Sequence, residues 1–207
     1  EVPALVDAWF GGQEIGHAVA DVLFGDVNPS GKLPFSYVNE LKESPAYGNY
    51  PGENLQVKYA EGIYVGYRSF DKHGIAPQFP FGYGLSYTNF GYSDLKIKPA
   101  AGSDPAQTFE VSLKVRNEGK RAGAEVVELY VHDGHSSVDR PVKELKGFRR
   151  VELAPGQSGE VTFTLDRGAL SYYSTEKKAW VAEPGKFEVL VGASAADIRV
   201  RGTLELR

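Results

Sequence analysis

The chain has 207 residues, 42% of them hydrophobic, and a formal net charge of −4. This length suits one large domain or two small ones, and an acidic chain without a basic block argues against nucleic acid and anionic membrane surfaces as partners. No apolar run approaches the roughly 20 residues that span a bilayer, and the absence of cysteine excludes disulfides and thiolate metal sites.

The first segment, residues 4–9, is apolar enough to predict a buried strand. No methionine and no basic, signal-like segment precede it. We therefore expect the chain to be a piece of a longer or processed protein; the alternative is a mature chain whose leader was removed. The compartment stays open, with a periplasmic or secreted location favoured over a cytoplasmic one.

The next element is an amphipathic helix that follows a Gly-Gly-Gln loop and stops at Gly25. Its apolar residues recur at helical spacing: Ile15, Ala18, Val19, Val22 and Leu23. Asn28–Gly31 predicts a turn, and Leu33–Phe35 restarts an extended segment. Strand, loop, helix and strand make one unit of an α/β sheet.

The loop around Trp9 and Gln13 is the candidate binding site. In open α/β sheets, ligands bind outside the carboxyl ends of the strands, which is where this loop falls. Trp9 could stack on a sugar ring and Gln13 could hydrogen-bond to hydroxyl groups. The competing interpretation makes Trp9 a core residue and Gln13 a partner of loop backbone. No Lys-Ser/Thr pair follows the glycines, so a phosphate loop is not predicted, and no cofactor is expected.

An aromatic connection is predicted over residues 45–89. Its tyrosines suit both a domain seam and a sugar platform, and the sequence favours the seam; they are Tyr47, Tyr50, Tyr59, Tyr64 and Tyr67. The run Phe79–Thr88, rich in Phe, Tyr, Gly and Pro, is predicted to be packed, because a free linker would be polar. We call Phe79–Thr88 the aromatic seam.

Glu61 and Asp71 are the carboxylates of this connection that could be considered catalytic. A glycosidase needs two carboxyl groups that flank the scissile bond. Arg68 lies between them in the sequence, and a structural ion pair with Arg68 explains all three residues more simply. We therefore assign no catalytic residue.

From Phe90 onward the hydrophobic period is two, and turn residues follow each segment. The alternating residues include Phe109, Val111, Leu113, Val115, Val127, Leu129, Val131, Val161, Phe163, Leu165, Phe187, Val189 and Val191. About seven short strands with regular turn signals predict an immunoglobulin-like or fibronectin III-like β-sandwich.

Acidic and histidine residues of this region give no metal site. His132-Asp133-Gly134-His135 supplies two histidines in one loop, at most half a site, so a solvated loop is expected. Asp104, Asp139 and Asp166 are interpreted as turn or strand-end residues.

These motifs, in this order, resemble the C-terminal part of family 3 glycoside hydrolases, the β-glucosidase-like enzymes. Residues 9–14 and 20–34 resemble the end of the family's α/β-sandwich domain, and residues 59–68 with the aromatic seam resemble the connection that follows. Val115–Gly119, residues 127–131, 145–148 and 184–187 resemble its fibronectin III-like domain. The expected fold is thus mostly β: the tail of an α/β-sandwich domain (1–44), the connection (45–89) and a sandwich (90–207).

The resemblance implies a function for the whole enzyme. Family members are retaining, exo-acting β-glycosidases whose nucleophilic Asp lies in an N-terminal (β/α)8 barrel and whose acid/base Glu precedes the Trp9–Glu14 motif. Neither position falls in this chain, so the chain alone is expected to be inactive. Its partners would be the barrel and α/β domain of the same enzyme and a glycoside substrate. The alternative is a free-standing carbohydrate-binding or adhesion module.

Overall fold

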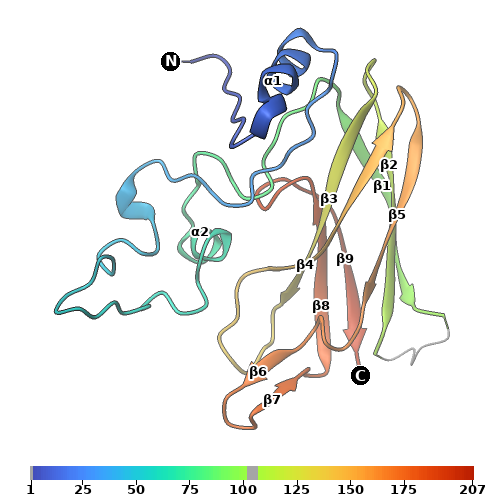
Figure 1. The fold of residues 1–207 in the computed structure, drawn as a ribbon. Coiled ribbons are helices and arrows are strands. Elements are labelled where there is room, and N and C mark those ends of the chain that lie inside the picture. Colours follow the sequence, from blue (N-terminus) through green and yellow to red (C-terminus); the bar gives the residue numbers. More distant parts are fainter. Residues whose placement is uncertain (1, 102–106) are drawn as a thin grey trace.

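The computed structural model describes residues 2–101 and 107–207 (Figure 1). Asp104, predicted to be a turn residue, lies outside the described residues. The helical elements are η1 (Gly12–Glu14), α1 (Ile15–Phe24), η2 (Leu41–Glu43) and α2 (Tyr67–His73). The strands are β1 (Phe90–Pro99), β2 (Phe109–Asn117), β3 (Gly123–Asp133), β4 (Glu144–Leu153), β5 (Ser158–Leu165), β6 (Tyr172–Ser174), β7 (Ala179–Val181), β8 (Gly185–Gly192) and β9 (Ile198–Leu206). Among the described helices, none has the length and apolar character needed to cross a membrane.

The predicted sandwich is confirmed. One sheet has the order β1-β2-β5 and the other β4-β3-β8-β9, with antiparallel pairing throughout (Figure 1). Alternation along each strand turns one row of side chains inward, so Val111, Leu113 and Val115 of β2 meet Val127 and Leu129 of β3 in one buried cluster. Each such side chain contributes about 1.5–3 kcal/mol by leaving water.

The aromatic seam packs at Phe81 against part of the outer face of the four-stranded sheet, which confirms the predicted packing there. Phe81 and Tyr67 of the N-terminal half pack against Tyr130 of β3, with ring centroids of Tyr67 and Tyr130 5.7 Å apart. The Ala195 backbone N–H donates to the Phe81 carbonyl at 2.9 Å. The Leu145 N–H donates to the Tyr67 hydroxyl at 2.8 Å. Both apolar contact and backbone pairing therefore fix the N-terminal half to the sandwich.

The tyrosine prediction is confirmed only near the sandwich. Tyr64 and Tyr67 are half-buried, whereas Tyr47, Tyr50 and Tyr59 are exposed. The reason is the path of the chain, because residues 45–60 project away from the sheets as an extended loop (Figure 1). Sequence periodicity also missed helix α2, whose seven residues make about two turns and are too few to show an apolar stripe.

At the N-terminus, the helix prediction is confirmed and the strand prediction is wrong. Helix α1 ends at Gly25, which has φ of 83°, a left-handed conformation that glycine adopts without strain. Residues 4–9 form no strand and are exposed. A strand needs a neighbour to satisfy its backbone groups, and no strand pairs with this segment in the described part of the chain.

Asn28 is a clamp and not a turn residue, so the turn predicted at Asn28–Gly31 is wrong. Its side-chain amide donates to the Ala122 carbonyl at 2.9 Å. Its oxygen accepts from the Ser86 hydroxyl at 3.0 Å and from the Tyr87 N–H at 2.8 Å. A short polar side chain such as that of Asn often favours a turn, but in this structure it joins three separate segments.

Candidate functional site

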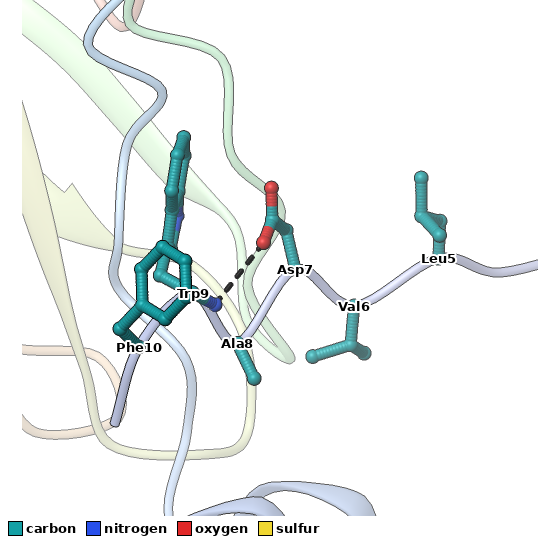
Figure 2. Close-up of a pocket in the computed structure, with 6 residues that line it drawn as sticks. All are labelled: Leu5, Val6, Asp7, Ala8, Trp9 and Phe10. Atoms are coloured by element: carbon teal, nitrogen blue, oxygen red, sulfur yellow. Dashed lines mark hydrogen bonds between the residues drawn. The ribbon is translucent and has the colours of Figure 1, made fainter. Parts of the chain in front are cut away.

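The loop predicted to bind a ligand lies at the exposed N-terminal end of the chain. Six consecutive residues, Leu5 to Phe10, curl around a depression of about 490 Å³ (Figure 2). Asp7 shapes the curl, because its carboxylate accepts the Trp9 backbone N–H at 3.1 Å (Figure 2). Trp9 itself has a φ of 48°, uncommon for a residue with a side chain. Since one segment forms every wall, the depression is a surface and not an enclosed cavity.

Trp9 is the outermost ring of an aromatic ladder that leads to the seam. Its ring meets Phe35 edge-on at 5.7 Å, and Phe35 lies 4.9 Å from Tyr37. Tyr37 meets Phe79 edge-on at 6.1 Å, and Phe79 lies 5.2 Å from Tyr83. Edge-on and tilted pairs are the geometries that aromatic quadrupoles favour. The ladder thus holds one side of Trp9 while leaving 52% of the residue exposed.

Asp7 ties this ladder to the loop and is a residue that sequence reasoning missed. The Tyr37 hydroxyl donates to the Asp7 carboxylate at 3.1 Å. Partial desolvation and this hydrogen bond raise the pKa of Tyr37, so the phenol stays protonated and continues to donate. The available signal was a single carboxylate within an otherwise apolar segment.

Gln13 lies in η1 and is exposed. No hydrogen bond joins it to Trp9 in the part of the chain that the structure describes. Gly12, with φ of 68° and open space where a Cβ would stand, leads the backbone into η1. Trp9 and Gln13 are therefore both exposed and flank the Gly11-Gly12 pair in the sequence.

The two carboxylates considered for catalysis have structural partners. Asp71 on α2 forms an ion pair with Lys143 at 2.6 Å, and both side chains are largely buried. Glu61 accepts a hydrogen bond from the Asn49 amide at 3.2 Å. The predicted pairing with Arg68 is therefore wrong for Asp71, because helix α2 turns that carboxylate toward the sandwich instead.

The segment His132–His135 is also structural, and the expected solvated loop is only partly correct. Residues 132 and 133 end strand β3, and the Asp133 carboxylate is buried against Arg140 at 3.1 Å. Within the described residues, no group of three or more His, Cys, Asp or Glu could hold a metal ion. Asp139 pairs with Lys72 at 2.9 Å, and Asp166 caps the turn after β5 by accepting the Ala169 N–H at 2.8 Å, as predicted for a strand end.

Comparison with protein families matches both halves of the chain. Residues 1–87 match the glycosyl hydrolase family 3 C-terminal domain, and residues 125–195 match the fibronectin type III-like domain. The chain belongs to glycoside hydrolase family 3. The family's two C-terminal modules account for the helix and seam on one side and the sandwich on the other.

Relatives in the family are much longer than this chain. Thermostable beta-glucosidase B of Acetivibrio thermocellus is 51% identical over 213 residues, which cover 100% of this chain and 28% of the relative. A beta-glucosidase of Bacteroides ovatus is 47% identical over 99% of this chain and 28% of its own length. The chain thus spans about 28% of the curated relatives it matches.

Solved structures agree with the fold. The family 3 beta-glucosidase of Bifidobacterium adolescentis superposes with a TM-score of 0.92 at 40% identity, over 97% of this chain and 29% of that one. Beta-glucosidase 3B from Thermotoga neapolitana, solved in complex with alpha-D-glucose, superposes with a TM-score of 0.86 at 41% identity, over 94% and 27%. The arrangement of α1, seam and sandwich is therefore that of family enzymes.

Proposed function

We propose that this chain is the C-terminal portion of a retaining, exo-acting β-glycosidase of the β-glucosidase type, and that the catalytic Asp and Glu lie in the other domains of that enzyme. Residues 1–44 complete an α/β domain, residues 45–89 connect it, and residues 90–207 brace it. The partners are the barrel and α/β domain of the same enzyme, and the substrate is a glycoside with a terminal β-linked sugar.

The exposed apolar surface of the N-terminal segment carries this proposal. Leu5, Val6 and Phe10 face solvent, as do Leu23 and Phe24 of α1. An exposed apolar patch of this kind marks an interaction surface. A segment that pairs with no strand in the described part of the chain and has an apolar face fits the edge of an α/β sheet whose other strands belong to the same enzyme.

Trp9 and Gln13 would then line the rim of the substrate site. The exposed face of the Trp9 ring suits stacking on a sugar ring, and the exposed Gln13 amide suits hydrogen bonds to hydroxyl groups. They would position substrate and take no part in bond making. A retaining mechanism needs a nucleophilic and an acid/base carboxyl about 5–5.5 Å apart, and the Asp71–Lys143 pair is already engaged in packing.

The pure 207-residue chain is expected not to hydrolyse aryl β-glucosides above the buffer rate, because both reacting carboxyls are assigned to other domains. The measurement is release of nitrophenol from nitrophenyl β-glucoside, with a full-length family enzyme assayed in parallel. Turnover by the chain that survives repeated purification and scales with its concentration would overturn the proposal.

A second prediction tests the exposed N-terminal surface. The chain is expected to bind an apolar dye and to self-associate, and the Phe10→Ser, Phe24→Ser double variant to lose most of both, because it removes two large exposed rings. Phe148→Ser, which removes an exposed ring from β4, is the control and should change neither. A monomeric wild-type chain that binds no dye would contradict the prediction.

One observation favours the alternative of a free-standing carbohydrate-binding module. On the β6–β7 hairpin, Tyr173 and Trp180 are paired across the strands and exposed, with ring centroids 5.8 Å apart. Exposed aromatic pairs suit sugar stacking, but they also stabilise hairpins without any ligand. A free-standing binding module would not need the exposed apolar surface of α1. A stable monomer that binds polysaccharide but does not bind the apolar dye would therefore support this alternative.

A further inference from the structure

Glu128 is a buried carboxyl held under the aromatic seam. It lies on β3, on the outer face of the four-stranded sheet, and is 3% exposed. The seam passes directly over it at Gly82, where an added Cβ would collide with the Glu128 carboxylate. Gly82 has φ of 80° and its N–H donates to the Leu33 carbonyl at 2.8 Å. Glu128 is therefore covered by backbone of the N-terminal half, and it forms no ion pair with any of the described residues.

The groups that face Glu128 are few. The Tyr130 hydroxyl, on the same face of β3, donates to its carboxylate at 2.5 Å. Lys32 is close enough to act on it but forms its ion pair with Glu125, at 3.2 Å. Further out, Tyr67 and Asp71 of α2 act on Tyr130, and the Lys143 ammonium lies 5.9 Å from the centre of the Tyr130 ring. Glu128 thus has one neutral hydrogen-bond donor and no ion pair in the described chain.

Burial has the larger effect on this carboxyl. It raises the pKa of Glu128 to about 7, while the Tyr130 hydrogen bond and Lys32 act in the lowering direction and Glu125 adds to the rise. A Glu128 side chain uncovered by release of the seam would return to its ordinary value of 4.5.

We propose that Glu128 is a proton-operated latch: neutral, it allows the seam to sit on the sandwich, and ionised, it weakens that docking. Gly82 of the seam lies against the Glu128 carboxylate, so release of residues 79–83 would expose the carboxyl to water. The latch is a property of this chain and does not depend on which glycoside the enzyme cleaves.

The direction follows from the two protonation states. The docked carboxyl holds its proton to a higher pH than the released one, so docking is strongest below about pH 4.5. It weakens as pH rises from 4.5 toward 7 and then levels off. The ratio of docked to released seam is expected to fall by up to about a hundredfold over that range.

Hydrogen–deuterium exchange of the 207-residue chain tests the latch, with Glu128→Gln as the partner variant. Amides at the contact between seam and sandwich, above all the Ala195 N–H that donates to the Phe81 carbonyl, should exchange at similar rates in both proteins at pH 4. At pH 8 they should exchange at least tenfold faster in the wild type, since comparison at one pH cancels the intrinsic base catalysis of exchange. Amides of β2 and β5 serve as an internal reference and should not differ.

Two further variants keep the test decisive. Glu160→Gln removes a carboxylate from the exposed face of β5 and should behave as wild type. Tyr130→Phe keeps Glu128 but removes its donor, so the weakening should continue to a higher pH than in the wild type. The proposal would be overturned by a wild-type Ala195 amide whose exchange follows β2 and β5 at every pH, or by a Glu128→Gln protein with the same pH dependence as the wild type.

Discussion

Replacement of Arg140 by methionine is expected to lower the free energy of unfolding by about 3–5 kcal/mol at pH 7. The guanidinium joins Asp133 at 3.1 Å and Glu144 at 2.5 Å, and it donates to the Leu170 carbonyl at 3.1 Å. The Arg140, Asp133 and Glu144 side chains are 6%, 7% and 15% exposed. Methionine fills a similar volume but leaves two buried carboxylates without their common partner. Urea unfolding, extrapolated to water, measures the change.

The loss should shrink as the pH falls. Burial by itself raises the pKa of Glu144, but Lys146 and Arg140 together outweigh burial and hold it below the ordinary value of 4.5. A carboxyl whose pKa is lowered in the folded state stabilises the fold at any pH above its ordinary pKa. This stabilisation is lost as the pH falls through the pKa of the folded state. In the methionine variant this contribution is reduced, so the difference between wild type and variant should shrink as the pH falls below 4.5 and through the depressed pKa of Glu144.

Arg150→Met is the matched control for this prediction. Arg150 pairs with Glu152 on the surface of β4, where the two side chains are 51% and 73% exposed. Exposed pairs contribute about 0–1 kcal/mol. Equal losses in the two variants would contradict the assignment of Arg140 as the centre of a buried ion network.

Replacement of Asn117 by alanine is expected to destabilise the chain by about 3 kcal/mol. Asn117 is fully buried at the end of β2. Its oxygen accepts from the Thr88 hydroxyl at 2.6 Å and the Gly119 N–H at 3.1 Å, and its amide donates to the Arg121 and Leu153 carbonyls at 2.7 and 3.0 Å. Alanine leaves these groups without partners, and each buried orphan costs about 1–3 kcal/mol. Thermal and urea unfolding both report the change.

A double-mutant cycle with Thr88→Val isolates the contact between seam and sandwich. Thr88 ends the seam, so the two single changes should be less than additive because each removes the same hydrogen bond. Asn39→Ala, at an exposed asparagine that also donates to a carbonyl, is the control and should cost less than about 1 kcal/mol. If the destabilisations of the Asn117 and Thr88 variants were fully additive, the hydrogen bond between the two residues would contribute nothing to the stability of the seam.

The sandwich was predictable because its information is local. The alternation of Val111, Leu113 and Val115 shows by itself that one face of a strand is buried. The Pro155-Gly156 pair likewise predicts a turn, and Gly156 has φ of 74° there. The stripe of α1 and its stop at Gly25 were predictable for the same reason. Residues 4–9 were mispredicted because an apolar segment becomes a strand only beside another strand.

The polar residues could not be placed in the same way. Asp71 pairs with Lys143, 72 residues away, and Asn28 clamps Ala122, 94 residues away. The residues next to Asp71 and Asn28 in the sequence do not allow these partners to be predicted, because the pairing depends on how the N-terminal half packs on the sandwich. The role of Asp7 beneath Trp9 and Tyr37 was hidden for the same reason.

By itself the sequence determined the family, the β-sandwich with its alternating core and the packed seam, because hydrophobic period and turn chemistry act over a few residues. Only the tertiary structure decided which charges are buried and which groups face one another: Arg140 between two carboxylates, Asn117 beneath the seam and Glu128 under Gly82. The physical reason is that the free energy of a charged or polar group depends on its burial, on nearby charges and on its hydrogen-bond partners. Those surroundings come from segments that meet only when the chain has folded.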